Sequence, residues 1–90
     1  MQRTKILASE IELPITTGTA TSFSSATVVR LVNTSTGTDY AVTVVETQSG
    51  SVIGSFTMMR ATTEFLEKQP SHCVYASNAA VRGAKVGFTN

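Results

Sequence analysis

The residues with the clearest chemical potential are the neighbours His72 and Cys73. An imidazole can activate a thiol as a nucleophile, and both side chains can ligate zinc. In a β-strand, however, adjacent side chains point to opposite faces. The 90-residue chain has no other histidine or cysteine to complete either arrangement. The pair therefore predicts neither a catalytic dyad nor a metal site, and a thiol that fills a small apolar space is favoured over an interchain disulfide.

Two carboxylates, Glu10 and Glu12, are spaced so that a strand places both on one face. Paired carboxylates are the catalytic unit of most glycoside hydrolases. A solvated face, or a charged edge that discourages unwanted strand pairing, accounts for the same spacing without any chemistry. We therefore expect a protein that is not an enzyme, with no catalytic, cofactor-binding or metal-binding residue and no small-molecule substrate.

The composition favours a single, nearly neutral domain that acts through contacts. Ninety residues allow one domain with one modest core. The formal net charge is +1 and the pI is 7.9. Charged residues make up 14% of the chain, against about 25% in an average protein, and Thr and Ser occupy many polar positions instead. This weak field argues against nucleic acid or an anionic membrane as the partner.

The single cysteine excludes an intrachain disulfide, so the core has to hold the fold together. The apolar run at residues 6–8 is much too short for a signal peptide or a membrane span. We expect synthesis and folding in a cytoplasm.

Alternating apolar and polar residues run through most of the chain and predict an all-β fold. No segment combines a helical period with caps, and turn signals recur at about the eight- to twelve-residue spacing of sandwiches and barrels. We predict a small antiparallel β-sandwich of Greek-key or immunoglobulin-like type with about seven strands, and a small β-barrel is the alternative. The predicted strands are 9–15, 26–32, 40–46, 52–59, 63–68, 73–77 and 81–89.

Several connections are also predicted. Segments 26–32 and 40–46 flank the turn-like sequence NTSTGTD and indicate a hairpin, with 52–59 as a third consecutive strand. Residues 16–25, TTGTATSFSS, indicate a surface loop whose one large apolar side chain is Phe23. Gly83 and Gly87 interrupt the last strand and indicate a bulge or a close backbone approach. One domain is expected over residues 1–90, with a short N-terminal arm at residues 1–8.

Six residues are candidates for contact with a partner. Arg3 and Lys5 lie on the polar arm, which could reach over a neighbouring subunit. Met59 and Arg60 end a predicted strand, where a flexible thioether can adapt to an interface, whereas Met58 is expected in the core. The candidate contact residues are Arg3, Thr4, Lys5, Phe23, Met59 and Arg60.

Three segments resemble small virion structural proteins of tailed bacteriophages, in particular those of cyanobacterial phages. Their sequences are VVRLVNTSTGTDYAVTVVE, GSVIGSFTMMRATTEFLEKQPSHCVYAS and VRGAKVGFTN, and the resemblance covers roughly residues 25–90. It carries no catalytic or ligand motif, so it implies a class of role and no site. The resemblance implies a virion location and partners among other virion proteins, namely the major capsid protein and further copies of the chain.

We therefore expect a non-enzymatic structural protein that binds repetitively to capsid subunits as a decoration or cement protein. A head-tail connector or tail component is the alternative within the same class. A carbohydrate-binding or adhesin-like module is the alternative from another class, because Tyr40 and Tyr75 could stack against sugar rings. The absence of Trp and the low aromatic content of 7% weaken this last alternative.

Overall fold

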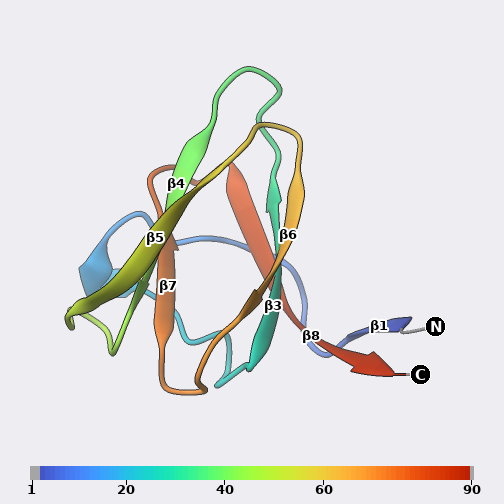
Figure 1. The fold of residues 1–90 in the computed structure, drawn as a ribbon, viewed down its shortest axis with the longest axis vertical. Helices are drawn as coiled ribbons and strands as arrows, with labels where there is room; N and C mark the ends of the chain where they lie inside the picture. The colour runs from blue at the N-terminus through green and yellow to red at the C-terminus, as the bar shows by residue number, and fades with distance from the viewer. Residues whose placement is uncertain (1–2, 90) are drawn as a thin grey trace.

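The computed structural model describes residues 3–89, with side chains for residues 4–16 and 18–87. Within these residues the chain forms two antiparallel sheets that face each other across a shared core, and no α-helix (Figure 1). The predicted all-β antiparallel sandwich is therefore confirmed. Its elements are β1 (Arg3–Ile6), β2 (Ile11–Glu12), the 3-10 helix η1 (Thr17–Thr19), β3 (Val28–Asn33), β4 (Tyr40–Val45), β5 (Val52–Met58), β6 (Thr63–Glu67), β7 (Cys73–Ala76) and β8 (Val81–Thr89).

The two sheets arise from nested antiparallel pairs. The outermost pair joins β1 and β2 to β8, the next joins Thr21 to Val74 of β7, and the inner pairs are β3 with β6 and β4 with β5. Two further pairs complete the sheets. Strand β3 also pairs with β8 in one sheet, and β4 also pairs with β7 in the other. The sheets then have the orders β1-β8-β3-β6 and β5-β4-β7, with β2 also on β8. This is the double Greek-key arrangement of a jelly roll, and it differs from the immunoglobulin order because β8 joins β3 and not β7.

The predicted hairpin between residues 26–32 and 40–46 is wrong. Strand β3 pairs with β6 and β8, whereas β4 pairs with β5 and β7 in the opposite sheet. The physical reason lies at the end of β3, where the fully buried side chain of Asn33 holds the connection. Its Nδ2 donates to the carbonyl oxygens of Thr38 at 3.2 Å and Met58 at 3.0 Å, and its Oδ1 accepts from the Ser35 N–H at 3.0 Å. The segment therefore crosses between sheets. Of the three consecutive strands predicted, only β4 and β5 form a hairpin.

The N-terminal segment takes part in the sheet. Residues 3–6 of the predicted arm form β1, which pairs with the last residues of β8, while Met1 and Gln2 lie outside the described residues. The strand predicted at 9–15 is reduced to β2. The Leu13 N–H donates to Val81 in one sheet and the Pro14 carbonyl accepts from Ala76 in the other, each at 2.9 Å. The chain thus changes sheets at Pro14, which has no N–H to continue a ladder.

The predicted surface loop at residues 16–25 contributes to the core, so this expectation is wrong for its apolar side chain. Phe23 is only 6% exposed and packs in the main cluster. Three consecutive residues, Phe23, Ser24 and Ser25, have φ between 54° and 59°, and the Ala26 N–H donates to the Ser22 carbonyl at 3.1 Å. This left-handed turn is disfavoured for residues with a Cβ by roughly 1–2 kcal/mol each. It turns the Phe23 ring inward, where apolar burial offsets the strain.

The expected close approach in the last strand is present at Gly83. An added Cβ would lie 2.8 Å from Cζ of Phe23 and 2.9 Å from Cδ2 of Leu31. At Gly87 the nearest such atom, Cδ1 of Leu7, is at 3.5 Å, which is ordinary contact. Gly83 is thus the position where the Phe23 ring rests on the sheet. A register shift occurs in the pairing of β4 with β5, between Val44 and Val45.

We expect Gly83→Ala to lower the free energy of unfolding by about 1–3 kcal/mol, because the new methyl group overpacks the Phe23 contact. Gly54→Ala is the matched control, since Gly54 also lies in a strand and nothing stands within 4 Å of its added Cβ. Urea denaturation of both variants measures the effect. Equal stability of the two variants would contradict the close packing of Phe23 on Gly83.

Candidate functional site

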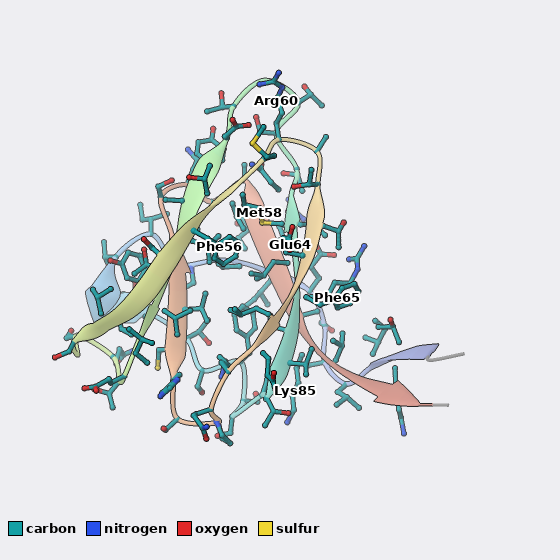
Figure 2. The ribbon with its side chains drawn as sticks, viewed as in Figure 1. Phe56, Met58, Arg60, Glu64, Phe65 and Lys85 are labelled. Carbon is teal, nitrogen blue, oxygen red and sulfur yellow. The ribbon has the colours of Figure 1, made fainter. Side chains whose placement is uncertain are left out.

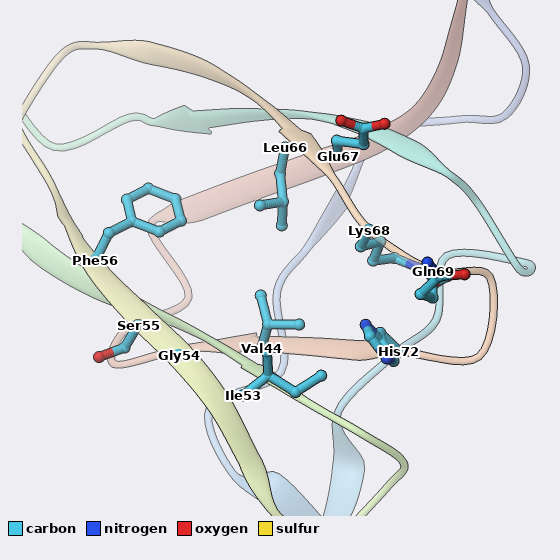
Figure 3. A pocket seen from close by; sticks show the side chains of 10 residues that line it. All are labelled: Val44, Ile53, Gly54, Ser55, Phe56, Leu66, Glu67, Lys68, Gln69 and His72. Carbon is cyan, nitrogen blue, oxygen red and sulfur yellow. Dashed lines mark hydrogen bonds between the residues drawn. The ribbon is translucent and has the colours of Figure 1, made fainter.

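A groove lies on the open side of the sandwich, between the outer strands of the two sheets. Strand β5 ends one sheet and β6 ends the other, and side chains from both strands line the groove between them, which has a volume of about 490 Å³ (Figure 3). Apolar side chains of four residues form much of its wall. The lining residues are Val44, Ile53, Gly54, Ser55, Phe56, Leu66, Glu67, Lys68, Gln69 and His72.

Strand β5 forms one rim of this groove and carries no charged residue. Its sequence is VIGSFTM, and within residues 3–89 it pairs with β4 on one side and with no strand on the other. Val45 pairs with Val52 and Val44 with Gly54, so Ile53 is the extra residue of a β-bulge. Val52 is 62% exposed and Ile53 is 50% exposed. An exposed, apolar edge strand without charge is well suited to accept another strand, because nothing repels a partner backbone.

Lys68 lies at one end of the groove. Its N–H donates to the Thr27 carbonyl at 2.9 Å, which continues the pairing of β6 with β3. The side chain follows the inward direction of Leu66, two residues earlier, and is only 7% exposed. Its Nζ donates to the carbonyl oxygens of Ala26 at 2.7 Å and Gln69 at 3.3 Å. Lys68 thus fastens the end of β6 to the start of β3.

The charge of Lys68 has no carboxylate partner in the described part of the chain, where the one ion pair joins Arg60 and Asp39 at 3.9 Å. Burial lowers the pKa of Lys68 from 10.5, its ordinary value. The Cys73 thiol opposes this shift, while the charge of Lys85 adds to it. Glu67 also lines the groove, but its carboxylate points away from the interior (Figure 3). Among the described residues, the acceptors for this buried ammonium group are neutral carbonyl oxygens, which do not balance its charge.

His72 and Cys73 point apart, as strand alternation predicts. His72 is half-buried and lines the groove. Cys73 is buried in a second apolar cluster with Ala20 and Val45, and its Sγ lies 3.7 Å from the Ser71 carbonyl oxygen. Over residues 3–89, no group of three or more metal-ligating side chains is gathered in one place. The arrangement offers neither a thiol dyad nor a metal centre within these residues.

The six candidate contact residues lie in three separate places. Thr4 and Lys5 are exposed on β1, and the side chain of Arg3 is outside the described set. Met59 and Arg60 are exposed in the turn between β5 and β6. This turn lies near the top of the view, away from β1 at its right side (Figures 1 and 2). The Arg60 N–H donates to Asp39 Oδ1 at 2.8 Å. Phe23 is a core residue, so its ring is not part of either surface.

The remaining sequence candidates lie outside the groove. Tyr40 packs against the main core cluster and Tyr75 against the smaller one, and both side chains are half-buried. Glu10 and Glu12 are both exposed, and Glu12 stands opposite Arg82 in the pairing of β2 with β8. This environment does not resemble a desolvated pair of catalytic carboxylates.

Sequence reasoning did not identify the groove or Lys68. The alternation from Leu66 to Lys68 was a usable signal, because it places the lysine on the same, inward face as the leucine. Val52 and Ile53 gave a second signal. They are adjacent apolar residues in a predicted strand, and adjacent side chains of a strand point to opposite faces, so one sheet face cannot bury both. Their exposure became evident only when β5 proved to be an edge strand.

Comparison of the chain with protein-family models, with curated proteins and with solved structures gives no match. Among the helices that the structure describes, none has the length and apolar character needed to cross a membrane.

We expect the pH dependence of stability to report the buried Lys68. Because its folded-state pKa is below 10.5, the unfolded chain binds more protons between the two values, and folding stability from this group rises with pH. The free energy of unfolding of the native chain, relative to Lys68→Met, should therefore increase as the pH rises toward 10.5. Urea titrations at several pH values measure this difference, and a difference that falls with pH would contradict the desolvation of Lys68.

Proposed function

We propose that this protein is a non-enzymatic structural module that binds other protein subunits repetitively, as a decoration or cement protein of a phage capsid. The observation that carries the contact role is the exposed and uncharged edge strand β5 beside an apolar groove. The assignment to a virion rests on the family resemblance of residues 25–90. The proposed partners are the major capsid protein and other copies of the chain.

The chemistry of β5 supports protein contact. A strand edge offers backbone donors and acceptors to an incoming strand, and alternate side chains then enter the adjoining hollow. Because β5 has no ionised side chain, covering it requires no charge to leave water. Val52 and Ile53 add apolar area that a partner would remove from solvent. These features favour a polypeptide partner.

A small module of this kind suits a repetitive lattice. Weak contacts of one subunit become strong when several engage one array, since each further contact is effectively intramolecular. Jelly rolls also recur in viral capsid proteins, although they recur in lectins too, so the fold is support by analogy only. A head-tail connector would use the same kind of contact at one vertex and remains the second proposal within this class.

We expect the chain to be present in purified virus particles from the source of this sequence. Quantitative mass spectrometry distinguishes the two virion roles. A decoration protein should occur at a fixed ratio to the major capsid protein, because both follow the capsid lattice, whereas a connector should be far scarcer. Absence of the chain from the particles would contradict both roles.

We expect Thr57→Lys to weaken binding to capsid particles by about tenfold or more, because a lysine on an edge strand opposes pairing with a partner strand. Thr57 is exposed on β5, so the change should leave the fold intact. Thr36→Lys, at an exposed position in the β3–β4 connection, introduces the same charge and is the control. Co-sedimentation with particles measures binding. Equal loss in both variants would indicate a general charge effect and exclude β5 as the contact.

A further inference from the structure

The open groove between β5 and β6 combines two properties that point to one kind of occupant. Val44, Phe56 and Leu66 contribute apolar side chains to its wall. Lys68 lines one end, and its buried Nζ donates to the Ala26 carbonyl oxygen (Figure 3). Pockets of about 300–1,000 Å³ with few convergent polar groups are typical ligand sites, and this groove, at about 490 Å³, lies in that range.

The charge balance of the groove is incomplete. A lysine ammonium has three donors, and two of them reach the carbonyl oxygens of Ala26 and Gln69. The groups that act on its charge are the Cys73 thiol and the Lys85 ammonium, with His72 on the same groove wall. None of these is a carboxylate, and that of Glu67 is directed away (Figure 3). A buried charge is costly unless it is paired, so an anionic group that enters the groove would be favoured there.

We propose that this groove binds an extended apolar segment of a partner chain and that an acidic side chain of the segment pairs with Lys68. The occupant is assigned as a polypeptide because the uncharged β5 forms the rim, where an incoming backbone can pair. A carboxylate fits a single ammonium, which it meets in a charge-assisted hydrogen bond. The inference rests on the proposed contact function and specifies its chemistry.

The chemical part of the proposal is testable on the isolated protein. Octanoate serves as the probe, since it joins an apolar chain to one carboxylate, and octanamide is its uncharged counterpart. We expect octanoate to bind about tenfold or more tightly than octanamide at pH 7, because only the carboxylate pairs with Lys68. Titrations followed by NMR chemical shifts should locate the change at Val44, Leu66 and His72. Equal binding of the two probes would overturn the carboxylate assignment without any variant being needed.

Two variants connect the effect to Lys68. Lys68→Met should reduce the affinity for octanoate by about tenfold or more and leave that for octanamide nearly unchanged. Lys5→Met is the matched control, because Lys5 is exposed on β1, is not among the residues that line the groove and does not act on the charge of Lys68. Its affinity for octanoate should stay close to that of the native protein. An equal loss in both variants would show a diffuse charge effect and overturn the assignment.

The partner part of the proposal requires the assembled particle. A carbodiimide condenses an amine with a carboxylate that is in contact with it. The product is an amide, and the carbodiimide takes up the water that is lost and becomes a urea. We expect mass spectrometry to find Lys68 joined to an Asp or Glu of another chain. Probe binding without this cross-link would overturn the polypeptide occupant and indicate a free carboxylate ligand. Failure of the proposed function would give a different result. The chain would then be absent from the particles, whereas the octanoate results on the isolated protein would be unchanged.

Discussion

The buried side chain of Asn33 holds the chain where it passes from one sheet to the other. Its amide satisfies backbone groups of Ser35, Thr38 and Met58, and the structure thereby ties the end of β3 to the end of β5. A buried polar group without such partners would be costly, so the side chain and the crossing stabilise each other. Every strand that follows depends on this crossing, because it places β4 and β5 opposite β3 instead of beside it.

The same crossing creates the open side of the sandwich. Strands β5 and β6 are consecutive, but the turn between them carries the chain back across the core, so they become the outer strands of different sheets. Leu66 and Phe56 pack partly against the core from either side. Apolar side chains therefore form part of the groove wall, and Lys68, which follows β6, lines it as well.

A strained segment packs its aromatic side chain into the core. The left-handed turn at Phe23, Ser24 and Ser25 places an aromatic ring over Gly83, and Lys85 donates to the Ser24 carbonyl from the adjoining strand. The turn is supported by two hydrogen bonds, in which the N–H groups of Phe23 and Ser25 donate to Thr21 Oγ1 and Ser22 Oγ, respectively. Backbone strain of this kind persists only where the surrounding structure fixes the conformation. Here the packing of Phe23 in the core fixes it. A segment of low sequence complexity thus contributes an aromatic side chain to the core.

The sequence by itself determined the all-β class and most of the strand segments. Alternation marks β3 to β8 closely, because side-chain direction in a strand is a local property with a period of two. It missed β1, whose residues look like a polar tail, and it assigned Phe23 to the surface. Only the tertiary structure decided which strands pair, since the partner of a strand edge is remote in sequence and a local pattern leaves it open. The partners of β3, the exposure of β5 and the burial of Lys68 all follow from that choice, which is why the groove could not be read from the residues alone.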